Sequence, residues 1–180
     1  MKTSGSKQKY LAFRKVADDG VLIQAVIFSV PEAIAITWLA CALAGSGCSW
    51  KRILIIGGLM GVFSVLVRPL VGNYLLNVVV YAGTLIAMMT MFKVAELWEN
   101  LTSVSIAMPI YMLLEFLNIS VWTEVFGVEP AAIMKGQNLR LLCFLPQLSA
   151  SLLIALLLTK YQVSLFSDET GPLRPFAGGR

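Results

Sequence analysis

The stretch FSVPEAIAITWL, residues 28 to 39, places a proline and a glutamate side by side in a run that is otherwise almost entirely apolar. Apolar side chains continue on both sides, so that about 25 residues, 21–45, form one helix-length segment. A helix of that length rises by ~37 Å, more than the ~30 Å thickness of the hydrocarbon core of a bilayer. The segment therefore predicts a tilted or kinked membrane span with an ionisable residue, Glu32, inside it.

The whole chain has the composition of a membrane protein. Its 180 residues are 58% hydrophobic and 13% charged, with a mean hydropathy of +0.80, whereas about 25% of the residues of ordinary soluble domains are charged. The apolar runs are helix-length and lack the alternation of strands, and helices satisfy their own backbone polar groups in lipid. The sequence predicts an all-α, polytopic bundle in the cell membrane, with the lipid bilayer as its partner.

Four further apolar segments follow the first one. They cover about 53–67, 74–92, 101–118 and 141–159, which gives about five transmembrane helices. We therefore divide the chain into a basic polar leader (1–20), a single helical bundle (21–160) and a flexible C-terminal tail (161–180). Residues 121–138 are too polar to cross a membrane and are interpreted as an interfacial loop.

Several classes of function are excluded by residue types that are missing or isolated. The sequence has no histidine, which removes Ser-His-Asp and Cys-His nucleophiles, histidine-liganded zinc and histidine-liganded haem. Its cysteines, Cys41, Cys48 and Cys143, form no CxxC pair, so neither a disulfide framework nor a thiolate metal site is indicated. We expect a non-enzymatic protein without catalytic residues, metal or cofactor. The net charge of +4 is spread over several loops, which does not favour nucleic-acid binding.

Each predicted span contributes one polar side chain at a similar depth. We name the membrane face on the N-terminal side of the first span face A and the opposite face B. Counting inward from face B along each helix gives depths of roughly 18 to 22 Å. The side chains, called the polar layer below, are Glu32, Arg68, Asn77, Glu115 and Gln147.

The polar layer has two interpretations. In the first, Glu32 and Arg68 form a structural ion pair and the amides hydrogen-bond between helices. In the second, the layer lines a cavity that is open to face A and receives a polar or charged ligand. Glu115 has no evident basic partner, which favours a solvated site.

The sequence around Pro31 also has two interpretations. The spacing Ser29-x-x-Glu32 matches a capping box, and proline suits the first turn of a helix. A helix could therefore restart at Pro31, as in the broken helices of transporters. The commoner alternative is one continuous helix with a proline kink.

The stretches SVPEAIAITWLACALAG (29–45), KRILIIGGLMG (51–61) and LVRPLVGN (66–73) carry a resemblance to a known group. They resemble small uncharacterised Firmicute integral membrane proteins, and the arrangement is similar to the membrane sensor half of accessory-gene-regulator-type histidine kinases. The resemblance covers about residues 25 to 160 and implies an outward-facing pocket that involves Glu32 and Arg68. The 180 residues hold no kinase half, so autophosphorylation is not implied.

Two functions remain open from the sequence. The first is a sensor or binding domain in a signalling or envelope process, and the alternative is a small transport subunit that captures a substrate within the bundle. Both imply a protein partner, in a signalling or a transport complex, and the number of membrane elements distinguishes them, because capture subunits usually have about six. The basic leader favours face A as cytoplasmic, whereas the resemblance places face A outside.

Overall fold

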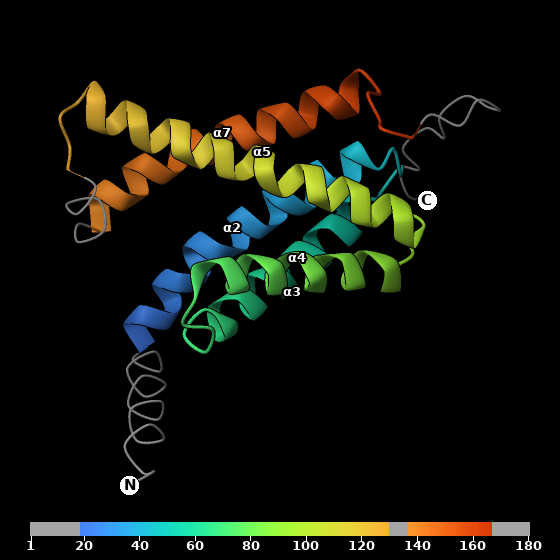
Figure 1. Cartoon of the computed structure of the whole chain (residues 1–180), viewed down its shortest axis with the longest axis horizontal. Helices are drawn as coiled ribbons and strands as arrows, with labels where there is room; N and C mark the ends of the chain where they lie inside the picture. Colours follow the sequence, from blue (N-terminus) through green and yellow to red (C-terminus); the bar gives the residue numbers. More distant parts are fainter. Residues whose placement is uncertain (1–18, 130–136, 167–180) are drawn as a thin grey trace, which may run out of the picture.

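The computed structural model describes residues 19–129 and 137–166, in which every regular element is an α-helix (Figure 1). The prediction of an all-α bundle is therefore confirmed. Five helices in this part of the chain are long and apolar enough to cross a membrane. In chain order they are α2 (Asp19–Leu43), α3 (Trp50–Val67), α4 (Tyr74–Met91), α5 (Leu97–Glu124) and α7 (Gln137–Lys160).

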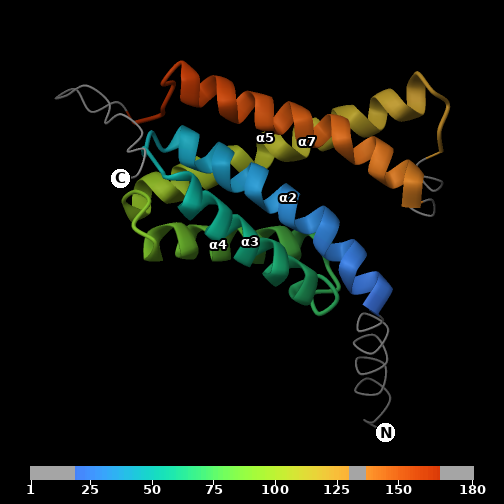
Figure 2. The same cartoon turned by 180° about the vertical axis from the view of Figure 1, so that it is seen from behind.

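The helices run back and forth along the long axis of the molecule. The α2–α3 and α4–α5 turns lie at one end, and the α3–α4 turn lies at the other (Figure 1). These ends correspond to face B and face A. Helix α2 is central: it packs against α3, α5 and α7, and from behind it runs between α3 and α7 (Figure 2). Nearly all side chains from Ala33 to Ala44 are buried, as expected of a helix surrounded by others.

Helix α2 continues through Pro31 without a break. The interpretation of a helix that restarts at Pro31 is therefore wrong. Proline removes one backbone N–H from the hydrogen-bond ladder, and the packing of the neighbouring helices keeps the two halves joined. Ser29 and Glu32 do not form the predicted capping box. Ser29 is buried inside the bundle, and the Glu32 carboxylate forms an ion pair with Arg68.

Helix α5 is longer than the predicted span 101–118. It begins after a capping box in which the Glu99 side chain accepts a hydrogen bond from the backbone N–H of Glu96 at 3.0 Å. Two glutamates in this reciprocal arrangement satisfy the first free N–H groups of the helix. At its other end α5 extends to Glu124, so 121–124 is helix and not interfacial loop. Part of that predicted loop, residues 130–136, lies outside the described residues.

Two glycines bring α3 into close contact with α2. A Cβ atom on Gly57 would lie 2.6 Å from the Cα of Ile34, and one on Gly61 would lie 2.6 Å from the Cα of Val30. The Gly-x-x-x-Gly spacing therefore serves packing inside the bundle, as small residues do in membrane helix contacts. These two contacts also fix the antiparallel register of α3 on the segment of α2 that carries Glu32.

The outer surface of the bundle is apolar. Large side chains such as Leu75, Val79 and Phe116 are more than half exposed, an arrangement typical of lipid-facing helices. Hydroxyl groups along these helices donate to carbonyls four residues earlier, for example Thr84 to Val80 at 2.8 Å, which satisfies them without water.

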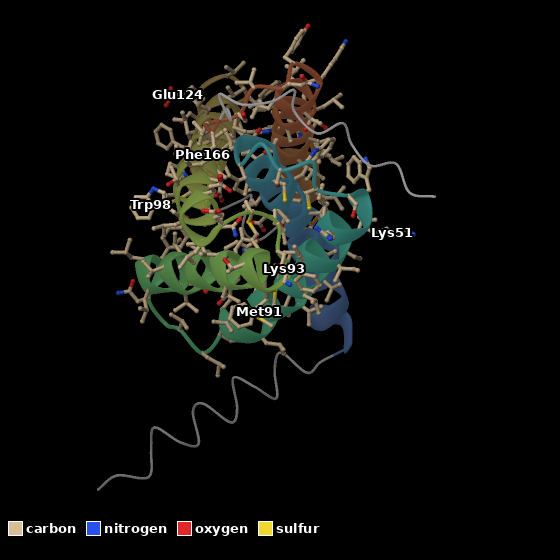
Figure 3. The ribbon with its side chains drawn as sticks, turned by 90° about the vertical axis from the view of Figure 1, so that its right-hand side faces the viewer. Lys51, Met91, Lys93, Trp98, Glu124 and Phe166 are labelled. Atoms are coloured by element: carbon tan, nitrogen blue, oxygen red, sulfur yellow. The ribbon has the colours of Figure 1, made fainter. Side chains whose placement is uncertain are left out.

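Charged and tryptophan side chains gather at the ends of the bundle. Viewed end-on from face B, Lys51 and Trp98 lie at opposite edges of the bundle and Lys93 lies nearer the middle of the view (Figure 3). Trp50 begins α3 at the same end, and Trp122 lies near the face A end of α5. This distribution fits the aromatic belts of membrane interfaces.

Candidate functional site: a polar cavity near face A

The face A half of the bundle contains an open-sided cavity of about 520 Å³. Its wall contains residues of α2, α4, α5 and α7, together with Arg68 directly after the end of α3 and residues of the α3–α4 turn. A volume of this size lies within the usual range of small-molecule sites, about 300 to 1,000 Å³. Every member of the predicted polar layer lines this cavity: Glu32, Arg68, Asn77, Glu115 and Gln147. The structure thus brings the whole layer together, while its role in ligand binding stays a prediction.

Glu32 and Arg68 form an ion pair on the cavity wall. An Arg68 Nη2 atom lies 3.2 Å from Oε2 and 3.4 Å from Oε1 of Glu32. The side chains are 42% and 23% exposed for Arg68 and Glu32, respectively, so the pair borders the cavity and is not enclosed in the apolar core.

The backbones of the two charged residues are not level, contrary to the depth count. The Gly57 and Gly61 contacts set Arg68 between two and three helical turns closer to face A than Glu32. Helical side chains lean toward the N-terminus of their own helix. In antiparallel helices Arg68 therefore leans toward face B and Glu32 toward face A, and the two long side chains meet.

Glu115 contributes the second carboxylate of the cavity. No ion pair or hydrogen bond of its side chain occurs within the described parts of the chain, although the side chain is only partly exposed. Gln147 is 7% exposed and its side-chain amide likewise has no partner there, while Asn77 is half-buried. These side chains leave several hydrogen-bond acceptors and donors on the cavity wall that a ligand could use.

Two tyrosines add hydroxyl groups that the sequence-based prediction missed. Tyr81 is 9% exposed, lines the cavity, and its buried hydroxyl has no hydrogen-bond partner among the described residues. Tyr111 is also buried on the wall, within electrostatic reach of both Glu32 and Glu115. A buried hydroxyl without a partner is costly, so Tyr81 marks a position that a bound molecule or water would satisfy. Tyr81 follows Tyr74 by seven residues on one face of α4, and this spacing is the signal that could have found Tyr81.

The wall is completed by apolar and aromatic side chains. The rings of Phe28 and Phe144 meet edge to face with their centroids 5.4 Å apart. Beside them the Asn118 amide donates to the backbone carbonyl of Cys143 at 2.6 Å, which joins α5 to α7 close to Pro146. Such a side chain stabilises the backbone near a helix proline. It also holds the two helices at a fixed spacing around the cavity.

A second, smaller cavity of about 70 Å³ lies at face B beside the α2–α3 turn. It is lined by Cys41 and Cys48, which are both buried and hydrogen-bonded to each other. That hydrogen bond lowers the pKa of the Cys48 thiol, with a further contribution from the charge of Arg52, against the opposing effect of burial. The sequence did not predict this contact. Within the described residues no cluster of three potential metal ligands occurs.

Comparisons of the chain with protein-family models, with curated proteins and with solved structures find no match. The class of the protein is therefore defined by the fold and the cavity. Five apolar helices are compatible with an integral membrane protein, and the five residues of the polar layer line one cavity near one end of that bundle.

Proposed function

We propose that this chain is a non-enzymatic, multi-pass protein of the cell membrane whose polar cavity binds a small polar ligand as part of a sensor. The observation that carries the proposal is the convergence of five intramembrane polar side chains on one cavity of about 520 Å³. Polar groups within membrane spans are costly and usually serve a partner or a pathway.

A purely structural role for the polar layer explains less of this wall. If the polar layer were purely structural, its polar groups would be paired with one another across the helices. The hydrogen bond from the Asn118 amide to the Cys143 carbonyl is an example of such pairing. Instead, the Glu115 carboxylate and the Tyr81 hydroxyl face the cavity without partners in the described residues. Both groups are the type that a ligand satisfies on binding.

Continuity of α2 supports the sensor over the transport subunit. A capture subunit of the usual kind has about six membrane elements with broken helices at the substrate site, whereas α2 passes Pro31 as one helix. The proposed sensor would follow the accessory-gene-regulator-type arrangement, with face A outside and a signalling protein as partner at face B.

The proposal predicts that the cavity binds small molecules. We would measure the Tm of the purified protein in nanodiscs with benzyltrimethylammonium, 2-phenylethanol or benzenesulfonate, each of which is smaller than the cavity. At least one probe, at about ten times its Kd, is expected to raise the Tm by about 2 °C or more.

The control for that measurement is Asn77→Trp, which fills part of the cavity from α4. The variant is expected to lose the shift, while Val79→Trp, on the exposed side of the same helix, keeps it. If none of the three probes shifts the wild-type Tm at millimolar concentration, the cavity is packing space and the proposed function is wrong.

A further inference from the structure

We infer that the ligand of the polar cavity is an organic cation, a primary or quaternary ammonium attached to an apolar body. The inference rests on the proposed function and adds the chemical class of the ligand. It follows from three features of the wall: a carboxylate that has no counter-ion among the described residues, a buried hydroxyl that has no hydrogen-bond partner among them, and a set of aromatic rings.

Charge selects the sign of the ligand. Glu32 is paired with Arg68 at 3.2 Å, so the positive charge on the wall is already engaged. Glu115 has no ion pair within the described residues, and an uncompensated charge inside a bundle is unfavourable. A bound cation would supply the counter-ion, whereas an anion would meet Glu115 on a wall whose described residues include no basic side chain besides Arg68.

Aromatic rings select the kind of cation. The rings of Phe28, Phe144, Tyr74, Tyr81 and Tyr111 all line the cavity. The faces of such rings attract ammonium groups, and cages of aromatic side chains recognise quaternary ammonium ligands. A hard metal ion would need several oxygen ligands held at short range, and the described residues hold no cluster of three potential metal ligands.

The remaining wall fits an apolar body on the cation. Met108, Met112, Val78 and Ile119 line the same cavity, and methionine adapts its shape to irregular apolar groups. The Tyr81 hydroxyl, 9% exposed at the residue level and without a described partner, can accept a hydrogen bond from a primary ammonium or order a water beside a quaternary one.

The test is isothermal titration calorimetry in nanodiscs of pure phosphatidylglycerol, whose headgroup carries no amine. Benzyltrimethylammonium is expected to bind, and 2-phenylethanol and benzenesulfonate are expected to bind at least about tenfold more weakly. Glu115→Gln should weaken the binding of benzyltrimethylammonium by about tenfold or more, because it removes the charge and keeps the shape.

Glu124→Gln is the matched control for Glu115→Gln. It removes the same charge from the exposed end of the same helix, outside the cavity wall, and should leave the affinity unchanged. An equal loss in both variants would show that the probe responds to surface charge and would overturn the inference. Tyr81→Phe keeps the ring and removes the hydroxyl. This variant should retain the binding of the quaternary probe benzyltrimethylammonium and weaken the binding of phenethylammonium, which is a primary ammonium.

The outcomes separate the ligand class from the proposed function. If 2-phenylethanol or benzenesulfonate binds as tightly as the cation, the cavity is a binding site but the inference is wrong. If no probe binds, both proposals fail. Repeating the titration with phosphatidylcholine in the nanodiscs identifies the source of the ammonium. Weaker probe binding there would indicate that a lipid headgroup occupies the cavity, and unchanged binding would indicate a free amine.

Discussion

Gly57→Leu is expected to destabilise the bundle by about 3 kcal/mol. A Cβ at this position would lie 2.6 Å from the Cα of Ile34, a backbone atom that can move away only if α3 separates from α2. Leucine adds further atoms into the same contact, and separation would also alter the register that places Arg68 near Glu32. Unfolding of the protein in mixed micelles by increasing amounts of sodium dodecyl sulfate measures the loss.

The matched control is Gly58→Leu, one residue further along the same helix. A Cβ there meets no atom within 4 Å, so the variant should stay within about 0.5 kcal/mol of the wild type. Both changes have the same effect on helix propensity and on hydrophobicity. If the two variants lose equal stability, the close contact between α2 and α3 does not hold the bundle together.

Arg68→Met is expected to cost about 1 to 3 kcal/mol, and more than Glu32→Gln. Removing the guanidinium leaves the Glu32 carboxylate, which is 23% exposed, without that ion pair inside the bundle. Removing the carboxylate leaves Arg68 at the end of α3 with 42% of its side chain exposed, from where it can extend toward face A and water. We therefore expect unequal effects from the two halves of one ion pair.

The double variant, Glu32→Gln with Arg68→Met, should recover part of the stability lost in Arg68→Met. Thermal unfolding of all four proteins in nanodiscs measures the coupling. Arg52→Met, an exposed arginine on the same helix, serves as the control and should be nearly neutral. Additive losses in the double variant would mean that the two side chains do not stabilise each other.

The sequence predicted the helical class and the members of the polar layer because both depend on patterns local in the chain. Helix-length apolar runs define the spans, and one polar residue within each run, such as Gln147, is visible without any knowledge of packing. The structure placed all of these residues on one cavity wall, although Glu32 and Arg68 are not level as the depth count had predicted.

Several features that depend on contacts between distant residues were not predicted, although the Glu32–Arg68 ion pair was one of the interpretations. The sequence around Pro31 allows two interpretations on local grounds, of which the kinked continuous helix is the commoner, and the packing of α2 against α3, α5 and α7 accompanies the continuous helix that is observed. Likewise, the approach of Cys41 to Cys48 depends on how the α2–α3 turn folds back. The depth count placed Arg68 level with Glu32 because it started from an assumed turn. The true register is set by the contacts of Gly57 and Gly61 with α2.

The most direct measurement asks whether water reaches the polar cavity inside the membrane. In a variant with all three native cysteines replaced by alanine, Asn77→Cys and Val79→Cys would each be reacted with the cationic, membrane-impermeant reagent methanethiosulfonate ethyltrimethylammonium. Val79 is 59% exposed, but it lies on the apolar outer surface that faces lipid. Asn77 is half-buried, but it lines the cavity.

In nanodiscs, where both faces meet solvent, the cysteine at position 77 is expected to react at least about tenfold faster than that at position 79, since lipid excludes the charged reagent. Benzyltrimethylammonium should slow the reaction at position 77 alone. Equal and negligible labelling of both cysteines would contradict a cavity open to water, and with it the proposal that the polar layer binds a ligand.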